Sequence, residues 1–345
     1  MHIIDLRSDT MTLPTPKMRE AMLRAKVSDD TVDGDPSVIE LEARVASLLG
    51  KEAGLLVLSG TMANQVAVMT SCRPGDEVIV SEESHIYNLE TGGLSSLAGV
   101  QPRPLPSPGG LYPMDLLLHT IKPKGVQSPQ AAMVCLENTQ DLNRGIVVNP
   151  ERMAQLASVV KGHGVHVYLD GARLFNAAAA LGVPPAEIAR PADFVMVCLS
   201  KGLAAPGGAV LAGDRQFIER ARRIRQRLGG GMRQIAGFMA AAGLVALDTM
   251  LPRLSQDHHN ARKLAERLSD VAGIVLNPGA VQSNIVSFSL DQLEADEFAE
   301  RLRREGVLVK PIGRDRARAV THKDISPDDV DTAVAAVSRV LRNSK

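Results

Sequence analysis

Cysteine is scarce in this sequence, which has three cysteines in 345 residues and no CxxC pair among them. Cys135 and Cys198 lie inside apolar, strand-like stretches, where cysteine packs as a small hydrophobic residue. We therefore expect Cys72, Cys135 and Cys198 to be buried free thiols, and we assign no metal ligand.

An excess of charge of either sign is also missing. Lysine and arginine number 39, aspartate and glutamate number 39, and the formal net charge at pH 7 is +0. A protein without a basic surplus gains no electrostatic affinity for nucleic acid or for an anionic membrane. The composition therefore favours small molecules and sister subunits as partners.

Long hydrophobic runs are absent as well. No run approaches the ~18 apolar residues of a membrane span. The first ten residues, MHIIDLRSDT, carry charges and lack the apolar segment of a signal peptide. These features predict a cytoplasmic protein with no membrane partner.

The sequence does contain an alternation of apolar, strand-like runs with helical patterns. The runs are GLLVL (54–58), EVIVS (77–81), AAMVCLE (131–137), VHVYLD (165–170) and DFVMVCLS (193–200). Between the third and the fourth, PERMAQLASVVKGHG has apolar residues at helical spacing, with proline at its start and glycines at its end. The repetition predicts an α/β fold with a mostly parallel sheet between helices, in which ligands bind beyond the carboxyl ends of strands.

Length and a change of pattern predict two domains. A chain of 345 residues exceeds what one hydrophobic core usually supports. From about residue 250 onward, a long polar helix, NIVSFSL, a second helix, VLVKPIG and a closing helix from Pro327 follow one another. We therefore expect a large domain at 1–250 and a smaller α+β domain at 251–345, with loops at 104–110 and 122–130.

Three strand ends carry residues that could bind a ligand or take part in catalysis. Asp170 directly follows the run VHVYL, and Lys201 follows VMVCLS. Gly60 and Thr61 lie between GLLVL and a helical stretch, so that free backbone N–H groups, a glycine and a hydroxyl can cradle a phosphate. Because the carboxyl ends of neighbouring parallel strands meet, we expect Asp170 and Lys201 to face one pocket.

Together these features match what pyridoxal 5′-phosphate requires. An amine forms the Schiff base, a carboxylate keeps the pyridine nitrogen protonated, and a helix start anchors the phosphate. Taken singly, a lysine at a strand end is typical of a surface charge, and an aspartate or SGT before a helix is typical of a cap. It is their conjunction that indicates the cofactor.

Motifs along the whole chain resemble the low-specificity L-threonine aldolases, pyridoxal-phosphate enzymes of the beta-eliminating lyase superfamily and the aspartate-aminotransferase fold (fold type I). The matching segments are DLRSDTMTLPTPKMREAM, SGTMANQVA, the His85 segment, CLENT, LDGARLFNAAAALG, LSKGLAAPGGAVLAG, GGGMRQIAG, NIVSFSL and AVTHKDIS. The resemblance implies that 1–250 is the cofactor-binding domain, with segment 1–15 near the active site. It also implies a homo-oligomer, a dimer or a tetramer, whose sites are completed across the interface.

The resemblance assigns roles to individual residues, with Lys201 and His85 as the candidate catalytic residues. The implied cofactor contacts are Lys201 as the covalent attachment point, Asp170 at the pyridine nitrogen, Gly60 and Thr61 at the phosphate, His85 stacked on the ring, Arg173 at the pocket mouth, and Arg233 reaching the phosphate across a subunit boundary. The implied contacts to the substrate carboxylate are Ser8, Arg173 and Arg318. A planar guanidinium binds a carboxylate bidentately, which agrees with arginine in this place.

The substrate side departs from the family pattern. CLENTQD has Gln140 where the family has a histidine that contacts the substrate's β-hydroxyl, Val32 falls where the family has a tyrosine, and Gln226 replaces a common lysine. Glutamine can hydrogen-bond a hydroxyl but cannot transfer a proton near neutral pH. We therefore expect weak activity on L-threonine, with glycine binding retained.

The predicted function is cleavage of L-threonine, L-allo-threonine or a related β-hydroxy-α-amino acid to glycine and an aldehyde. Because Gln140 replaces the histidine, β-elimination or racemisation on the same scaffold is an alternative, and both reactions begin by breaking Cα–H instead of Cα–Cβ. A non-catalytic, cofactor-binding regulator is a more distant alternative.

Overall fold

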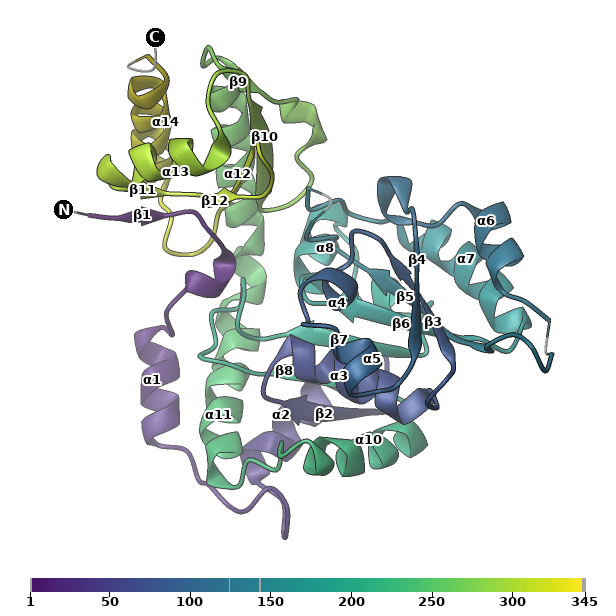
Figure 1. Cartoon of the computed structure of the whole chain (residues 1–345). Helices are drawn as coiled ribbons and strands as arrows, with labels where there is room; N and C mark the ends of the chain where they lie inside the picture. Colours follow the sequence, from purple (N-terminus) through teal and green to yellow (C-terminus); the bar gives the residue numbers. More distant parts are fainter. Residues whose placement is uncertain (1, 124, 143, 343–345) are drawn as a thin grey trace.

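The computed structural model describes residues 2–123, 125–142 and 144–342, and its largest feature is a seven-stranded sheet (Figure 1). The strand order is β2-β8-β7-β6-β5-β3-β4. Neighbouring strands are parallel from β7 to β4, whereas β8 runs antiparallel to both of its neighbours. The strands are β2 (Ala53–Val57), β3 (Glu77–Ser81), β4 (Gln101–Leu105), β5 (Ala131–Glu137), β6 (His166–Gly171), β7 (Phe194–Cys198) and β8 (Ala209–Gly213).

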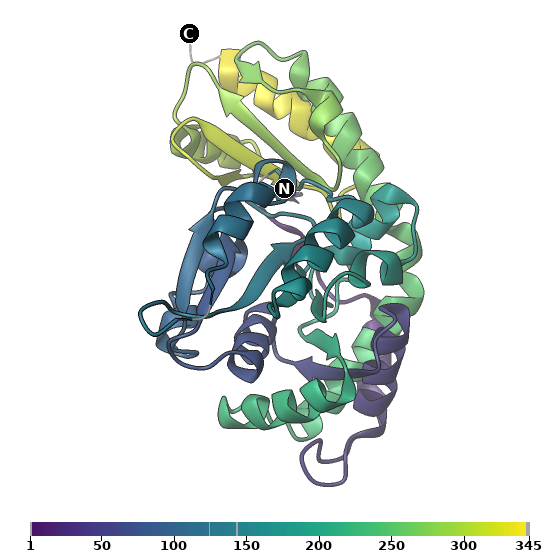
Figure 2. The same cartoon turned by 90° about the vertical axis from the view of Figure 1, so that its right-hand side faces the viewer.

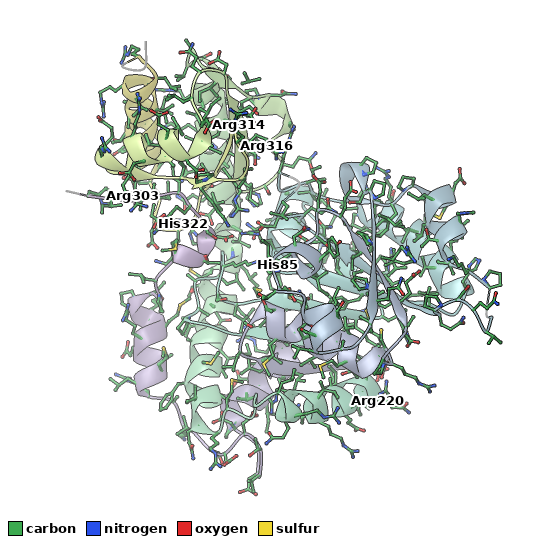
Figure 3. The ribbon with its side chains drawn as sticks, in the orientation of Figure 1. His85, Arg220, Arg303, Arg314, Arg316 and His322 are labelled. Carbon is green, nitrogen blue, oxygen red and sulfur yellow. The ribbon has the colours of Figure 1, made fainter. Side chains whose placement is uncertain are left out.

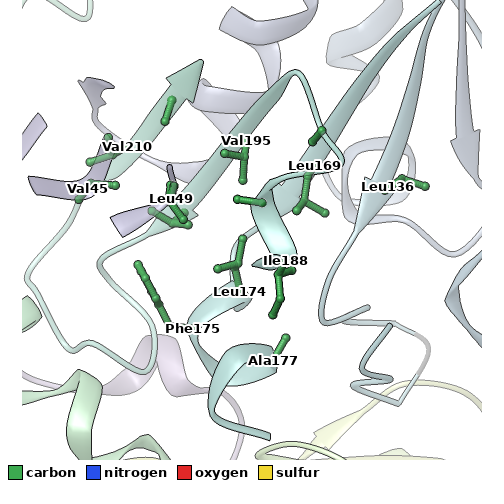
Figure 4. Close-up of a cluster of buried hydrophobic side chains, with 14 of the residues drawn as sticks. Val45, Leu49, Leu136, Leu169, Leu174, Phe175, Ala177, Ile188, Val195 and Val210 are labelled. Carbon is green, nitrogen blue, oxygen red and sulfur yellow. The ribbon is translucent and has the colours of Figure 1, made fainter. Parts of the chain in front are cut away.

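Both faces of this sheet are buried. Successive residues of a strand point to opposite faces, so each strand supplies side chains to two hydrophobic clusters. In β7, Val195 and Val197 belong to one cluster, and Met196 and Cys198 belong to the other. Figure 4 shows part of the first cluster, in which Val195 and Leu174 lie.

Helices cover both faces, because each buries an apolar side against the sheet. Helices α2, α7, α8 and α11 supply residues to the first cluster, and α3 and α10 supply residues to the second. The bounds are α2 (Pro36–Leu48), α3 (Gly60–Ser71), α7 (Pro150–Gly162), α8 (Leu174–Leu181), α10 (Arg215–Arg227) and α11 (Gln234–Thr249). Shorter helices are α1 (Pro16–Leu23), α4 (His85–Asn88), α5 (Gly93–Ser96), α6 (Met114–Thr120) and α9 (Pro185–Ala189), with 3₁₀ turns η1 (Asp9–Met11) and η2 (Pro108–Gly110).

A second, four-stranded antiparallel sheet, in the order β12-β13-β10-β9, lies in the C-terminal part, drawn in green to yellow at the top of Figure 2. Its hydrophobic cluster includes Ile4 and Leu6, because β1 (Ile4–Asp5) pairs in parallel with β11 (Val307–Leu308). The two ends of the chain therefore meet in one core, and the domain boundary at residue 250 stays a prediction. The other elements are η3 (Leu251–Arg253), α12 (Leu254–Ser269), β9 (Ile274–Val275), η4 (Pro278–Ala280), β10 (Ile285–Leu290), α13 (Ala295–Arg304), β12 (Lys310–Pro311), β13 (Arg316–Val320) and α14 (Pro327–Arg342).

The expected α/β fold with a mostly parallel sheet is confirmed by this strand order. EVIVS and AAMVCLE form β3 and β5 with the bounds that the sequence predicts. Cys72, Cys135 and Cys198 are buried free thiols, as expected from their apolar surroundings.

Strand β4 differs from the sequence-based expectation of a loop at 104–110. Pro102 and Pro104 argue against a strand, since proline has no N–H to donate to the ladder. However, β4 lies at the edge of the sheet and pairs with β3 alone, so half of its backbone groups need no strand partner. The loop expected at 122–130 includes Lys124, which lies outside the described residues.

Among the described residues, no single helix is long and apolar enough to cross a membrane. Gln234–Thr249 and Leu251–Ser269 meet the criterion of length and composition only as a pair, which is bent by 43°. Both helices pack within the fold, α11 against α1 and α2, and α12 against α8 and α14.

His258 gives the packing of α12 against α8 a dependence on pH. Its ring is buried, and its Nε2 lies 3.2 Å from Nδ2 of Asn176. Burial, together with the nearby charge of Arg262, lowers the pKa of His258 from 6.5 to about 4. Between these values the unfolded chain binds more protons than the folded one, so the free energy of unfolding falls as the pH drops through this window, by up to roughly 3 kcal/mol.

We therefore expect urea unfolding to show lower stability at pH 5 than at pH 7. His258→Gln should be less stable at pH 7 and should lose less stability on acidification, because glutamine can keep a hydrogen bond to Asn176 but has no proton to gain. Equal pH slopes in the two proteins would show that His258 is not the titrating group.

Candidate active site

The start of helix α3 forms one wall of a cavity at the C-terminal ends of β6 and β7. The hydroxyl of Ser59 caps this helix by accepting a hydrogen bond from the backbone N–H of Met62 (3.1 Å). A Cβ on Gly60 would lie 2.9 Å from Sγ of Cys198 and 3.0 Å from Cε of Met196, so a larger residue would require these side chains to shift. The cavity is lined by Gly60, Thr61, Asn64, His85, Asp170, Ala172, Met196, Cys198, Ser200 and Lys201.

Asp170, near the end of β6, places a carboxylate in this cavity with a fixed orientation. The residue is 4% exposed. Its Oδ2 accepts a hydrogen bond from Nδ2 of Asn64 (2.9 Å), and its Oδ1 accepts one from the backbone N–H of Ala172 (3.0 Å). Asn64 is itself held by the hydroxyl of Tyr168, which donates to its Oδ1 (2.6 Å). A carboxylate held in this way can stabilise a cationic group beside it.

His85 begins helix α4 and lines the same cavity, on the side of the large sheet that faces the C-terminal part (Figure 3). Its Nδ1 lies 2.9 Å from Oε1 of the buried Glu90. The side chains of His85, Glu90 and Asp170 lie close together, with one polar atom of each within 4.8 Å of the others. The hydrogen bond to Glu90 raises the pKa of His85, although burial opposes the shift. The ring is therefore equipped to accept a proton.

Glu137, the last residue of β5, connects the His85 side of the cavity with the loop that follows. Its Oε2 accepts a hydrogen bond from the backbone N–H of His85 (2.9 Å), and its Oε1 accepts one from that of Asp141 (2.7 Å). Burial raises the pKa of Glu137 to about 8, and the negative charge of Asp170 adds to the effect. This buried carboxyl therefore fixes the backbone on both sides of it.

Arg173 is buried just before α8 and is held by two carboxylates. Its Nε and Nη2 donate to the two carboxylate oxygens of Asp9, each at 2.8 Å. Its Nη1 donates to Oδ1 of Asp141, also at 2.8 Å. Burial alone would lower the pKa of Arg173, but the charges of Asp9 and Asp141 outweigh burial and raise it. With all three nitrogens engaged, the guanidinium has one orientation.

Arg318, on β13, reaches the same Asp141 from the C-terminal part. Its Nη1 donates to Oδ1 of Asp141 at 2.8 Å. Burial would raise the pKa of Asp141, but the positive charges of Arg173 and Arg318, with that of Lys201, hold it well below its usual range. Arg318 is 3% exposed, and its Nε has no hydrogen-bond partner among the described residues. The structure thus brings Arg173 and Arg318 together around a carboxylate of the protein itself.

Lys201 follows β7 and lines the cavity beside Asp170. The hydroxyl of Thr12 donates to the backbone oxygen of Lys201 (3.2 Å). The hydroxyl of Ser8 caps η1 by accepting from the backbone N–H of Thr10 (3.2 Å). The N-terminal segment is therefore packed against the turn that carries Lys201.

Three residues that the sequence analysis singled out lie elsewhere. Gln140 is 1% exposed, and its Nε2 donates to Oγ of Ser107 (3.3 Å). The side chain of Arg233 is 77% exposed, and Val32 is 75% exposed on the loop before α2. Within one chain, none of the three lines the cavity that holds Lys201, and Ser8, Arg173, Gln226 and Arg318 are not among its lining residues either.

The fold and these strand-end residues define a class of protein, the pyridoxal-phosphate enzymes of fold type I. A threonine aldolase of Leishmania major superposes with a TM-score of 0.81 at 20% identity, covering 98% of this chain and 99% of that one. The chain matches the beta-eliminating lyase family over residues 5–291. It is 41% identical to low-specificity L-threonine aldolase 1 of Arabidopsis thaliana, over 99% of this chain and 97% of that protein. It is 37% identical to the low specificity L-threonine aldolase of Escherichia coli (strain K12), over 96% and 98%.

This chain belongs to the beta-eliminating lyase family and, within it, to the low-specificity L-threonine aldolases. It is therefore a carbon–carbon lyase with pyridoxal 5′-phosphate as its cofactor. The resemblance stated from the sequence motifs is confirmed. The role of each individual residue remains a proposal.

Sequence reasoning missed five polar residues that hold this site together, namely Asp9, Asn64, Glu90, Glu137 and Asp141. Glu137 carries the same signal as Asp170, since it ends an apolar strand of the parallel sheet. Asp9 and Asp141 lie 164 and 32 residues away from Arg173 in the sequence. No local sequence pattern predicts contacts between residues so far apart.

Proposed function

We propose that this protein cleaves L-threonine, L-allo-threonine or a related β-hydroxy-α-amino acid into glycine and an aldehyde. The observation that carries the proposal is the convergence of Lys201, Asp170 and the start of α3 on one cavity. The relatives named threonine aldolases supply the substrate class, since they match nearly the whole chain.

The cavity suits pyridoxal 5′-phosphate in three respects. The backbone N–H groups at Gly60 and the hydroxyl of Thr61 would hold the phosphate at a helix start. Asp170 would keep the ring nitrogen protonated, Lys201 would carry the cofactor covalently, and His85 would stack on the ring. When bound, the cofactor supplies an electron sink for the bond that breaks at Cα.

Arg173 and Arg318 would bind the substrate's α-carboxylate, with Ser8 beside them. Their guanidinium groups already meet around one carboxylate oxygen, that of Asp141. A clamp on the carboxylate would determine which bond at Cα is presented to the electron sink that the cofactor supplies. Orientation of this kind is worth ~7–11 kcal/mol of a barrier in well-placed systems. These residues can therefore select the reaction without touching the bond that breaks.

We assign removal of the β-hydroxyl proton to His85. The hydrogen bond that its ring donates to Glu90 raises the pKa of His85, which suits a general base. Gln140 would contact the β-hydroxyl by resemblance alone, and its amide is held toward Ser107. The amide of Gln140 cannot take up the proton, whether it points to Ser107 or to the β-hydroxyl.

We further propose a cytoplasmic homo-oligomer, a dimer or a tetramer, in which Arg233 completes the phosphate site of a neighbouring subunit. The exposed side chain of Arg233 has one distant ion-pair partner in its own chain, Asp29 at 4.0 Å, among the described residues. Its backbone has φ 49°, an unfavourable value for a residue with a Cβ, which indicates that the position is under constraint. We also propose that the chain divides into a large domain at 1–250 and a smaller domain at 251–345.

A product analysis tests the proposed reaction. The holoprotein is incubated with L-threonine, L-allo-threonine and a panel of other amino acids, and glycine, aldehyde, keto acid and ammonia are measured. Equal amounts of glycine and aldehyde are expected. Keto acid with ammonia would instead indicate β-elimination, and loss of optical activity without products would indicate racemisation. A holoprotein that turns over none of the panel would be a cofactor-binding regulator.

Gln140→His is expected to raise aldehyde release from L-threonine, provided the new ring reaches the substrate. A well-placed general base contributes typically ~10²–10⁴-fold in rate, which sets the upper limit of the gain. Gln140→Asn is the matched control, because it keeps an amide and adds no proton acceptor. If the native protein cleaves L-threonine briskly and the histidine variant is no faster, Gln140 is a tolerated substitution in an ordinary threonine aldolase.

A further inference from the structure

The carboxylate of Asp141 occupies the point at which the two candidate substrate-binding arginines converge. One oxygen, Oδ1, accepts hydrogen bonds from Nη1 of Arg173 and Nη1 of Arg318, both at 2.8 Å. The two arginines come from different parts of the fold, α8 and β13. Asp141 thus links them.

The two arginines already have carboxylate partners without a ligand. Asp9 is fully buried and binds Arg173 through two hydrogen bonds of 2.8 Å, so the charge of this arginine already has a partner. Asp141 then pairs with Arg318, whose Nη1 donates to it at 2.8 Å. A substrate carboxylate that arrives would add a second negative charge beside Asp141, which is unfavourable in a buried place.

Arg318 nevertheless keeps an unused donor. Its Nε is buried and has no hydrogen-bond partner among the described residues. A buried donor without a partner costs free energy, so a ligand that supplies an acceptor gains from binding there. Asp141 and Arg318 also line one cavity together, with Leu142, Ile312 and Arg316. Arg316 lies on the face of the C-terminal part that is turned toward the large sheet (Figure 3).

We propose that Asp141 is a resident carboxylate that competes with the α-carboxylate of the substrate, and that it sets the affinity of this enzyme for amino acids. The incoming carboxylate displaces Asp141 from Arg318 and takes over the donors that Asp141 held, with Nε of Arg318 in addition. The inference rests on the proposed role of Arg173 and Arg318 as the substrate's carboxylate clamp.

The backbone around Asp141 is held by contacts that do not involve its side chain. The N–H of Asp141 donates to the buried Glu137 (2.7 Å), and the backbone of Gln140 bonds to Ile146 across the loop. The side chain of Asp141 is 11% exposed, whereas that of Asp9 is 0% exposed. Asp141 is therefore the carboxylate at the clamp that a ligand can reach.

The test compares native holoprotein with Asp141→Asn, which keeps the shape of the side chain and removes its charge. Two measurements are made, the glycine concentration that half-saturates the shift in melting temperature, and KM and kcat for L-threonine. We expect glycine to bind on the order of tenfold more tightly to Asp141→Asn. KM should fall while kcat changes little, which a purely structural role of Asp141 would not produce. Acetate, a carboxylate without an amine, should stabilise the variant more than the native protein.

Asp30→Asn is the matched control, because it removes the charge of another buried carboxylate that pairs with an arginine, Arg225 (2.7 Å), in a different cavity. It should lower stability without tightening glycine binding. Asp141→Ala is a second variant, and it removes the carboxylate without adding an amide. If folded Asp141→Asn and Asp141→Ala both bind glycine and acetate no more tightly than the native protein, Asp141 is not a competitor. Tighter glycine binding in variants of a protein that fails to cleave any β-hydroxy amino acid would uphold the inference and overturn the proposed function.

Discussion

Replacement of Lys201 by alanine is expected to abolish both turnover and covalent attachment of the cofactor. Lys201 lines the cavity between Asp170 and the start of α3, and among the described residues it is the one lysine that does so. Loss of a positioned proton-transfer group alone costs up to ~10⁴-fold in rate, and loss of the attachment point adds to this. Lys201→Arg should be equally inactive, because an arginine keeps the charge but cannot lose its proton to act as a nucleophile.

The measurement is borohydride reduction of the native holoprotein, followed by mapping of the cofactor adduct by mass spectrometry. Lys51 provides a matched control. Its Nζ donates to the backbone oxygen of Ala192 (2.6 Å), and burial lowers its pKa to about 8, so this amine has an unusually large neutral fraction. Lys51→Arg should trap the cofactor as the native protein does. An adduct that survives Lys201→Ala at full occupancy would remove Lys201 from the site.

Asp170→Asn is expected to lose roughly 10²–10³-fold in turnover while it keeps the fold and binds the cofactor. A loss of roughly 10²–10³-fold is typical when one preorganised electrostatic group is removed from an active site. The carboxylate of Asp170 favours a protonated ring nitrogen through its charge, and an amide of the same shape has no such charge. The hydrogen bond from Ala172 can persist in the variant, because the amide oxygen still accepts it.

Turnover has to be compared at measured cofactor occupancy, since weaker binding would also lower the rate. Tyr168→Phe is the matched control, because it removes the hydroxyl that holds Asn64 and leaves the charge of Asp170 unchanged. We expect the phenylalanine variant to stay within about tenfold of the native rate. Near-native turnover of Asp170→Asn at full occupancy would assign the stabilising charge to another group, for which Glu90 is the nearest candidate.

The convergence of Lys201, Asp170 and Gly60 on one cavity was predictable because each of these residues has a local signal. Lys201 and Asp170 follow apolar strands, and the carboxyl ends of parallel strands meet at one edge of a sheet. Gly60 lies between a strand and a helix, where the backbone N–H groups are free. In these three cases the position along the chain implies the position in space.

The substrate side had no such signal. Arg318 lies on an antiparallel strand of the C-terminal sheet, and Asp9 lies in a 3₁₀ turn near the N-terminus. Gln140 stood out in the sequence, yet its neighbour Asp141 is the residue that contacts the arginines, because a turn after β5 sends consecutive side chains in different directions. A spacing pattern does not contain that information.

The sequence by itself determined the alternation of strands and helices, both buried faces of the sheet and the edge at which the cofactor residues gather. These depend on periodicity and on strand direction, which are local properties of the chain. Only the tertiary structure decided that Asp9, Asp141, Arg173 and Arg318 form one buried ionic cluster. These residues contact one another across up to 177 positions of sequence. A buried charge needs a partner of opposite charge, and only the folded core determines which charged side chains are buried together.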